Sequence, residues 1–377
     1  MSEIRDPDGA CRPAEQASRQ PGPILDLFAG AGGWEEGLRP LRLCAVGVDA
    51  DPWACETGRA AGHERLQADV TRLDPNDFAP AWGLIASPPC QAYSTAGKGL
   101  GRGDKTVVMA CARELTAGSD TRAERVRECR DPRSLMIVEP LRFAFALRSR
   151  WVALEQVPAA LDLWSLFAEL LSRHGYQTAA GILSAERYGV PQTRKRAFLI
   201  ASLDGPVQLP PPTHRSYDPC RQRTPEHDAG LKPWVSMADA LGLVPCAYET
   251  RQSGARSRPV SEPAPAMVAA RLAKGTPVWA GRRPATTVSC DRRVHPPGHK
   301  QNASDPPGRY EQRRGVNAIR VTVEQAATLQ GFRPGYPWQG ARTRQFEQVG
   351  NAVPPPLAHR VLEQAMAASI GERGLRS

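Results

Sequence analysis

The stretch "PILDLFAGAGGWEEGL", from Pro23 to Leu38, decides the fold. Its first half, Ile24 to Phe28, is a short apolar run of the kind that forms a buried parallel strand. The run passes into Gly30-Ala31-Gly32-Gly33 and then into a plausible helix, which gives the order strand, tight turn, helix. Glycines in such a turn let the backbone approach a ligand, and the helix start offers unpaired N–H groups. The stretch therefore predicts the first unit of an α/β domain that binds a ligand at this turn.

Acidic residues close the next two predicted strands. The stretch "LCAVGVDAD" ends its apolar run at Asp49, and "LQADVTRL" places Asp69 in a similar position. Open α/β sheets bind their ligands just outside the carboxyl ends of the strands. We expect Asp49 to accept hydrogen bonds from ribose hydroxyls, and Asp69 to accept from an adenine amino group or to cap the next turn. The pattern predicts a nucleoside site that lacks the lysine of an ATP-type P-loop.

The stretch "GLIASPPCQAYSTAGKG", from Gly83 to Gly99, places a cysteine at the exit of another strand. The apolar run from Gly83 to Ala86 must stop at Pro88-Pro89, because proline has no N–H to donate to a sheet. Cys90 follows directly. Taken alone, such a cysteine is either a small core residue or a presented thiol, and the first is the more common.

The glycine-rich continuation after Cys90 carries Lys98, Arg102 and Lys105. Two interpretations fit a basic, glycine-rich segment beside a thiol. It is either a mobile lid that closes on a charged substrate or a plain solvated linker.

Two later stretches add an acid and a set of donors. In "RWVALEQVP" an apolar strand from Trp151 to Leu154 ends in Glu155, and a carboxyl group at a buried strand exit can carry a proton near neutral pH. A surface or capping glutamate is the alternative. In "QTRKRAFLIA" the residues Gln192, Arg194 and Arg196 alternate into a strand. Alternation predicts that all three point to one face, whereas charge alone would suit a solvated edge.

A helix is predicted to begin at Asp131-Pro132, an N-cap followed by proline at the first helical position. Its expected apolar face consists of Leu135, Val138, Leu141 and Phe145. Pro140 is expected to kink it.

Length and charge indicate two lobes with different partners. A chain of 377 residues and 40.9 kDa exceeds the size at which one core usually stops growing. The net charge is +10, and residues 205–315 hold 17 Lys and Arg against 9 Asp and Glu, together with 17 of the 36 prolines. This segment is predicted to be a loop-rich lobe with a basic surface for a polyanionic partner, or else a solvated insertion.

Several classes of protein are excluded by composition. No apolar stretch approaches the length of a membrane span, and the polar N-terminal residues lack the apolar core of a signal peptide. We therefore expect a protein that stays in the cytosol with a frayed N-terminal tail. Nine cysteines without CxxC or Cys/His spacing predict reduced thiols, with neither a disulfide framework nor a zinc site.

Six short motifs follow one another in a specific order: "DLFAGAGG", "SPPCQAYS", "LEQV", "QTRKR", "LQGF" and "GNAVPP". In this order they closely resemble the motifs of cytosine-C5-specific DNA methyltransferases of the bacterial and phage type. The resemblance runs from about Ile24 to the C-terminal helix and leaves the basic segment as the family's target recognition region. It implies an α/β fold, with a doubly wound, Rossmann-like, S-adenosylmethionine-dependent methyltransferase domain and a smaller, loop-rich target recognition domain.

The resemblance also implies S-adenosyl-L-methionine as the cofactor and no metal. Asp49 would take the ribose and Asp69 the adenine. The full set of residues that the matching motifs assign to this cofactor is Phe28, Gly30, Gly32, Asp49, Asp69, Pro89, Asn351 and Val353.

For the chemistry, the resemblance assigns Cys90 as the nucleophile, Glu155 as the group that holds and protonates cytosine N3, and Arg194 and Arg196 as residues that orient the base and the glutamate. Cytosine C5 is too weak a nucleophile to take a methyl group directly, so a thiolate first adds to C6. A donor at N3 disperses the charge that builds up during this attack. Because C6 is shielded in a duplex, the target base must be flipped out, and the Gly99–Lys105 segment is the expected closing element.

Double-stranded DNA is the partner that the resemblance implies. The expected organisation is a disordered tail over residues 1–22, a catalytic and cofactor-binding domain over 23–205 that is completed by 345–377, and a target recognition domain over 206–344. We expect a monomer in the cytoplasm, associated with the nucleoid and not with a membrane. A cognate restriction endonuclease would not be required for activity.

Three other functions are compatible with parts of the pattern. A tRNA cytosine-C5 methyltransferase shares the scaffold, although the long, basic, proline-rich lobe favours a duplex DNA reader. A DNA amino-methyltransferase usually has an aromatic residue where Cys90 stands. A catalytically silent DNA-binding homologue is disfavoured because Cys90, Glu155 and Arg196 are intact.

The sequence departs from the usual family pattern at two places. Gln156 follows Glu155, where the family normally has Asn, so the backbone support around the glutamate is expected to differ. The segment from about Thr106 to Arg130 is longer than in compact members. The DNA sequence that the protein recognises depends on loop geometry, and residues 205–315 do not predict it.

Overall fold

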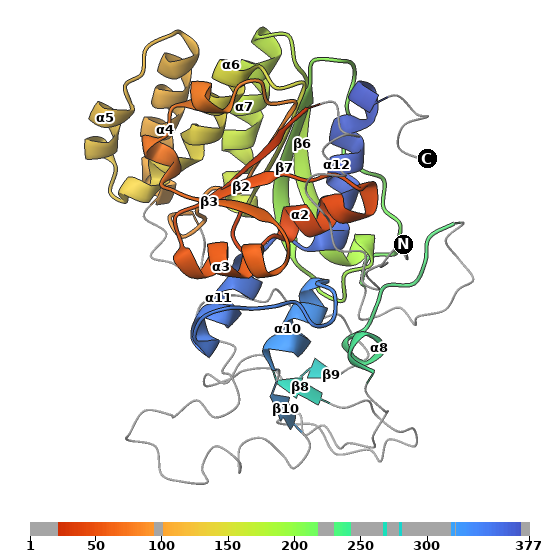
Figure 1. Ribbon diagram of the computed structural model, residues 1–377. Coiled ribbons are helices and arrows are strands. Elements are labelled where there is room, and N and C mark those ends of the chain that lie inside the picture. The colour runs from red at the N-terminus through yellow and green to blue at the C-terminus, as the bar shows by residue number, and fades with distance from the viewer. Residues whose placement is uncertain are drawn as a thin grey trace, which may run out of the picture.

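The structure is a computed structural model that describes residues 22–93, 101–217, 230–242, 267–269, 279–280, 318–320 and 322–370. The tail predicted over residues 1–22 therefore lies outside the described residues except for Gly22. A seven-stranded sheet in the order β3-β2-β1-β4-β5-β7-β6 forms the centre of the larger lobe (Figure 1). Its strands are β1 (Ile24–Leu27), β2 (Val46–Asp49), β3 (Glu64–Gln67), β4 (Gly83–Ala86), β5 (Trp151–Gln156), β6 (Gln177–Ser184) and β7 (Lys195–Ser202).

The sheet is parallel except for β7, which runs antiparallel to both of its neighbours. Strand order reverses direction at β1 and β4, so the chain winds outward on both sides of this point. Ligands of open α/β sheets bind at such a switch point. The predicted doubly wound α/β fold is confirmed.

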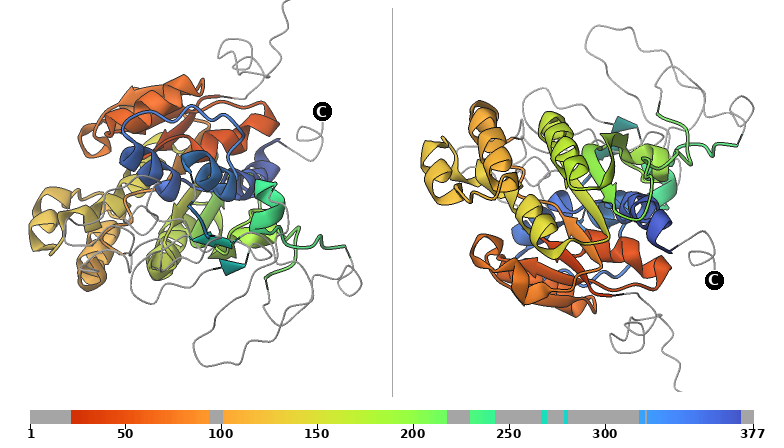
Figure 2. Two further views of the ribbon diagram at one scale, coloured as in Figure 1. Left: turned by 90° about the horizontal axis from the view of Figure 1, so that it is seen from below. Right: turned by 90° about the horizontal axis from the view of Figure 1, so that it is seen from above.

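Helices cover both faces of the sheet (Figure 2). One face carries α4 (Gly101–Thr116), α6 (Glu139–Leu147) and α7 (Leu161–Arg173), and the other carries α2 (Gly33–Leu38) and α12 (Pro355–Ile370). Strand β5 is buried along its whole length because it lies between these two layers. The other helices are α3 (Pro52–Ala60), α5 (Arg122–Arg125), α8 (Met237–Leu241), α10 (Val323–Gln330) and α11 (Arg342–Asn351), with 3₁₀ turns at 39–41, 70–72, 75–78, 126–128, 132–138, 158–160 and 185–188.

The end of the chain returns to the beginning of the fold. Helix α12 packs against α2, and the segment before it passes the start of α2. A Cβ at Gly33 would overlap the carbonyl oxygen of Val353, so this close passage requires glycine. The expected completion of the large lobe by the C-terminal segment thus has a specific backbone contact.

The described part of the smaller lobe contains a three-stranded sheet in the order β10-β8-β9, made of β8 (Met267–Ala269), β9 (Trp279–Ala280) and β10 (Ala318–Arg320). Helix α10 contacts both α8 and α11 (Figure 1). Much of the basic segment over 205–315 lies outside the described residues. The domain boundaries at 205/206 and 344/345 stay predictions.

The helix predicted from Asp131 is divided in two. Asp131 caps it as expected, because its Oδ1 accepts from the backbone N–H of Arg133 at 3.1 Å. The residues Pro132–Val138 form a 3₁₀ segment, and α6 begins afresh at Glu139. Pro140 therefore lies in the first turn of α6, where proline needs no kink, and the predicted kink was wrong. Of the predicted apolar face, Leu135, Val138 and Leu141 are buried, whereas Phe145 is only partly buried.

The predicted basic lid is wrong over residues 101–105. These residues form the first turns of α4, and Lys105 Nζ lies 2.7 Å from the carboxylate of Asp162. Lys98 and the rest of 94–100 lie outside the described residues. Among the residues that the structure describes, no helix has both the length and the apolar character needed to cross a bilayer.

Candidate active site

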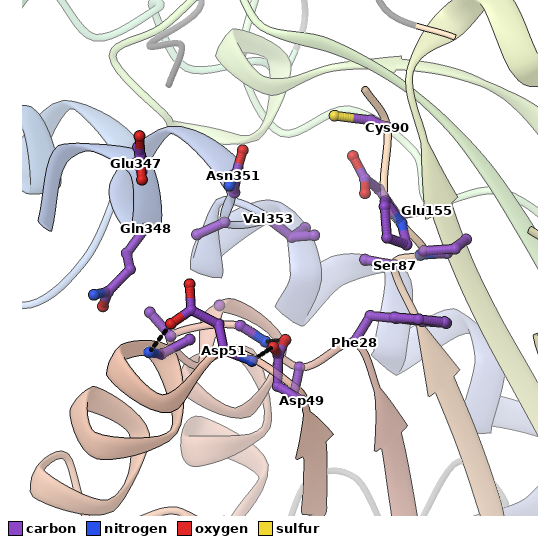
Figure 3. Close-up of a pocket in the computed structure, with 18 of the residues that line it drawn as sticks. Phe28, Asp49, Asp51, Ser87, Cys90, Glu155, Glu347, Gln348, Asn351 and Val353 are labelled. Atoms are coloured by element: carbon purple, nitrogen blue, oxygen red, sulfur yellow. Dashed lines mark hydrogen bonds between the residues drawn. The ribbon is translucent and has the colours of Figure 1, made fainter. Parts of the chain in front are cut away.

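A cavity of about 530 Å³ opens at the carboxyl ends of β1, β2, β4 and β5 (Figure 3). It is lined by every predicted site residue except Gly32, namely Phe28, Gly30, Asp49, Asp69, Pro89, Cys90, Glu155, Arg194, Arg196, Asn351 and Val353. The residues come from seven separate segments of the chain. The fold therefore gathers the predicted catalytic and cofactor residues around one space.

The glycine turn after β1 shapes one wall of this cavity. Gly30 has φ of 56°, and Phe28 has φ of 58°, a left-handed conformation that costs energy in a residue with a Cβ. Gly32 is closely packed against Tyr336. A Cβ there would come within 2.6 Å of the Tyr336 hydroxyl oxygen, and that hydroxyl donates to the carbonyl of Ala31. Gly32 therefore has a packing role in the turn, and its predicted contact with the cofactor stays a prediction.

Asp49 holds the turn as well as facing the cavity. Its Oδ2 accepts from the N–H of Gly30 and its Oδ1 from the N–H of Asp51, each at 2.8 Å. Burial raises the pKa of Asp49, and these two N–H donors act in the opposite direction. A carboxylate has about four lone-pair sites, so two of them remain for ligand hydroxyls.

Asp69 fulfils the capping alternative. Its Oδ1 accepts from the backbone N–H of Thr71 at 3.0 Å and from the Thr71 hydroxyl at 2.8 Å. The other oxygen, Oδ2, lies 3.5 Å from Nε of Arg72, which is largely exposed. Because Asp69 also lines the cavity, capping by Oδ1 leaves Oδ2 available to a ligand.

The opposite end of the cavity holds the thiol and the acid. Glu155 lies inside β5, opposite Phe198 of β7, and not just beyond the strand as predicted. Burial of the thiol raises the pKa of Cys90, while the positive charges of Arg196 and Arg194 oppose that shift. Nε of Arg196 lies 2.9 Å from Oε1 of Glu155.

Gln156 connects the two strand exits. Its Nε2 donates to the carbonyl of Pro88 and its Oε1 accepts from the N–H of Val157, each at 2.8 Å. The side chain is fully buried. The residue that departs from the usual family pattern is therefore fully hydrogen-bonded, and it ties the chain before Cys90 to the chain after Glu155.

The predicted fork of Gln192, Arg194 and Arg196 is only partly present. Strand β7 begins at Lys195, so the three residues do not share one strand face. Gln192 points to α10, where its Nε2 donates to Oε1 of Gln330 at 2.7 Å. Arg194 lines the cavity but is fully buried, and its Nη1 donates to the carbonyl of Gly350 at 3.0 Å. Arg196 is the residue of this set that pairs with Glu155.

Sequence reasoning missed several lining residues. Asp51, Glu347 and Gln348 lie at the end of the cavity away from Cys90 (Figure 3). Asp51 caps α3 by accepting from Trp53 N–H at 2.9 Å, and the dipeptide Asp51-Pro52 is a recognisable helix start. Gln348 and Glu347 precede Asn351 by three and four positions, which is one helical turn, so they share its face of α11.

No group of three His, Cys, Asp or Glu residues that could hold a metal occurs in the described ranges. The polar groups around the cavity are carboxylate acceptors and the N–H donors of the backbone and of arginines. Their chemistry suits a nucleoside at one end and a polar base at the other.

The family model of the C-5 cytosine-specific DNA methylases matches residues 23–118, 122–232 and 254–367. The chain belongs to this family. The predicted family resemblance is therefore confirmed over both lobes.

Curated relatives of this DNA methylase are similar over most of their length. It is 26% identical over 378 residues to the type II methyltransferase M1.HphI of Haemophilus parahaemolyticus, covering 92% of this chain and 87% of the relative. It is 24% identical over 405 residues to the type II methyltransferase M.DdeI of Desulfomicrobium norvegicum, covering 90% and 88%.

Solved structures share the fold of this DNA methylase at lower sequence identity. A Spodoptera frugiperda DNMT2 variant superposes with a TM-score of 0.57 at 16% identity and covers 92% of this chain and 99% of its own. The Dnmt2 methyltransferase of S. pombe gives 0.54 at 14% identity, with coverage of 92% and 98%. These likenesses support the α/β methyltransferase fold.

Proposed function

We propose that the protein transfers a methyl group from S-adenosylmethionine to C5 of a cytosine flipped out of double-stranded DNA, within a specific sequence, through a bond between Cys90 Sγ and C6. The observation that carries this proposal is the single cavity, with Cys90, Glu155 and Arg196 at one end and Asp49 and Asp69 at the other. The family to which the chain belongs supports the choice of reaction.

The residues at the Asp49 end fit the proposed cofactor. Asp49 and Asp69 offer acceptors to a ribose and to an adenine amino group, while Phe28 offers an apolar ring and Gly30 a close backbone. Pro89, Asn351 and Val353 enclose the space between this end and the thiol. When bound here, S-adenosylmethionine supplies an electrophilic methyl group.

The residues at the Cys90 end perform the steps on the base. The Cys90 thiolate adds to C6, so that C5 becomes electron-rich enough to accept a methyl group. Glu155 holds N3, where a proton or hydrogen bond disperses the developing negative charge, and Arg196 holds Glu155. After methyl transfer, loss of the C5 proton and departure of Cys90 release 5-methylcytosine.

Burial of the thiol implies that Cys90 must be activated within the complex. Its raised pKa keeps the thiol protonated in the free protein near neutral pH, and the nearby Arg194 and Arg196 favour the thiolate. Entry of the base displaces water from this end of the cavity and so strengthens the influence of these charges.

The charge of the chain and the names of its relatives support the partner and the biological setting that we propose. The surplus of positive charge over residues 205–315 supports double-stranded DNA as the partner and target recognition by residues 206–344. The relatives are type II methyltransferases, which supports a restriction-modification setting for this chain. We further propose a monomer that works in the cytoplasm at the nucleoid and needs no endonuclease for activity.

The test is to incubate the purified protein with S-adenosylmethionine and unmethylated genomic DNA and to map 5-methylcytosine by bisulfite sequencing. We expect methylation confined to one short motif, at least about 10³-fold loss with Cys90→Ala, and full activity with the control Cys44→Ala, which lies outside the cavity. Bulk tRNA is assayed in parallel. Methylation of tRNA alone, or retained methylation with Cys90→Ala, would contradict the proposal.

A further inference from the structure

The edge strand β3 is anchored in an unusual way. Three of its four side chains, those of Glu64, Leu66 and Gln67, are exposed, and Leu66 is 39% exposed. The fourth, Arg65, is buried. Strands of parallel sheets are usually held by inward-pointing apolar side chains. The only inward anchor within β3 is a charged arginine.

Arg65 reaches the interior through a passage made by two glycines. A Cβ at Gly47 of β2 would overlap Nη1 of Arg65, and a Cβ at Gly58 of α3 would overlap its Nε. Beyond the glycines, Nη1 pairs with Oε1 of Glu35 of α2, and both side chains are almost completely buried. Any side chain at these two positions would close the passage.

A second carboxyl group lies beside this ion pair. Asp26 of β1 is fully buried, and its pKa is raised well above the ordinary value by burial and by the neighbouring Glu35, with Arg65 acting in the opposite direction. The ion pair of Arg65 and Glu35 thus has a second buried carboxyl group beside it. A lone loss of Arg65 would leave a buried carboxylate without compensation.

The strand that Arg65 anchors leads directly to the cofactor end of the cavity. Gln67 of β3 pairs with Asp49 of β2, and the N–H of Ala68 donates to the Asp49 carbonyl at 2.9 Å. Asp69 is the next residue. Its position relative to the cavity thus depends on where β3 lies, and β3 is held by its pairing with β2 and by the buried side chain of Arg65.

We propose that Arg65 is a positioning residue for the adenine-binding part of the site: its pairing with Glu35 through the Gly47 and Gly58 passage fixes β3, so that Asp69 can accept from the adenine amino group. The inference rests on the proposed function, which assigns adenine to Asp69. Beyond that assignment, it identifies the buried ion pair that holds Asp69 in position.

The experiment measures calorimetric binding of two probes, S-adenosylhomocysteine and S-inosylhomocysteine, which has an oxo group in place of the adenine amino group. The main variant is the double replacement Glu35→Gln/Arg65→Met, which removes both charges and leaves no unpaired one. Arg65→Lys, which keeps the charge, is the second variant in case the double variant does not fold. Asp69→Asn reports on the adenine contact itself, and Arg173→Met, which removes an exposed ion pair with Glu169, is the control.

We expect the wild type and Arg173→Met to prefer the adenosyl probe. The double variant should bind that probe at least about tenfold more weakly, with less than about a twofold change for the inosyl probe. Asp69→Asn should also bind the adenosyl probe at least about tenfold more weakly, whereas the inosyl probe should bind no more weakly, because the amide N–H can donate to its oxo group. Arg65→Lys should lie between the wild type and the double variant. Equal weakening for both probes would indicate general loss of structure and overturn the inference, as would unchanged binding.

The experiment distinguishes failure of the proposed function from failure of the role proposed for Arg65. If the wild type binds neither probe, the proposed cofactor is wrong. If Asp69→Asn loses the preference between the probes while the double variant keeps it, the adenine assignment stands and the role of Arg65 is rejected. If Asp69→Asn keeps the preference, the adenine assignment falls and the inference with it.

Discussion

Nε of Arg196 lies 2.9 Å from Oε1 of Glu155, and both side chains are nearly buried beside Cys90. The two residues come from adjacent antiparallel strands, with Glu155 opposite Phe198 and Arg196 two positions before it. The arginine therefore holds the carboxyl group from one side and leaves its other edge to the cavity. A group held in this way is positioned for a base before the base arrives.

Glu155 and Arg196 should act as one unit in the chemical step. Glu155→Gln and Arg196→Gln should each lower the single-turnover methylation rate by about 10²–10³-fold, because each removes charge stabilisation from the transition state. The double variant should be little slower than either single variant. The measurement is rapid-quench methyl transfer at saturating DNA and S-adenosylmethionine. Multiplication of the two single effects would show that the residues act independently.

Gln156 should be needed for the relative placement of Cys90 and Glu155. Gln156→Leu leaves the Pro88 carbonyl and the Val157 N–H without their partner, which should cost about 1–3 kcal/mol in the free energy of unfolding. It should also slow single-turnover methylation more than it weakens DNA binding. Gln156→Asn keeps both polar groups on a side chain that is one methylene shorter, and its effects should be smaller. Equal effects of the two replacements would show that the hydrogen bonds are unimportant.

The reactivity of Cys90 should rise steeply at alkaline pH. Burial raises the pKa of its thiol, so the thiolate that reacts with iodoacetamide forms at higher pH than in an exposed cysteine. The alkylation rate, followed for the Cys90 peptide by mass spectrometry, should rise over a more alkaline range than that of a free cysteine in the same buffers. Arg196→Gln should move the profile to still higher pH, because the arginine charge favours the thiolate. A profile that coincides with that of free cysteine, or lies below it, would contradict this prediction.

Gly33 should tolerate no side chain, whereas Gly103 should. In Gly33→Ala the new methyl group would overlap the Val353 carbonyl oxygen, so the C-terminal segment must move, at a cost of about 1–3 kcal/mol. The Cβ of Gly103→Ala would lie 3.3 Å from Nη1 of Arg130, and alanine at this exposed position of α4 should stabilise by about 0.5–1 kcal/mol. Urea denaturation of both variants, with S-adenosylmethionine binding measured alongside, provides the test.

The parts of the site that the sequence revealed are those at strand exits. Asp49 ends an apolar run and Asp69 comes two residues after the next strand, and their position at the carboxyl ends of the strands follows from the parallel topology. Cys90 and Glu155 were located for the same reason. An error of one residue at Glu155, which lies within β5, did not matter because the side chain still faces the cavity.

The parts that the sequence did not reveal depend on contacts between distant segments. Gly32 has the appearance of a ligand-facing glycine, but its missing Cβ makes room for Tyr336, which lies more than 300 positions later. Gln192 alternates with the two arginines, yet α10 provides its partner. Lys105 resembles a loop lysine until Asp162 of α7 is seen beside it. Local spacing contains no information about such partners.

The pairing of Arg65 with Glu35 shows the same limit. A lone arginine in a four-residue edge strand predicts a solvated side chain. Gly47 of β2 and Gly58 of α3 both lie against the Arg65 side chain, and their lack of a Cβ leaves the space through which it reaches the interior.

Because Val353 lies against the start of α2 and lines the cavity, the cavity is completed late in the synthesis of these residues. Phe28 and Val353 line the same cavity but are more than 300 residues apart in the chain. At a synthesis rate of roughly 5–20 residues per second, the first is made tens of seconds before the second. A ribosome-bound chain that has not yet extended past α11 has the sheet but lacks one wall of the cavity. The protein therefore acquires its binding site only after residue 353 has been made, and chains that end before Val353 should be unable to use the cofactor.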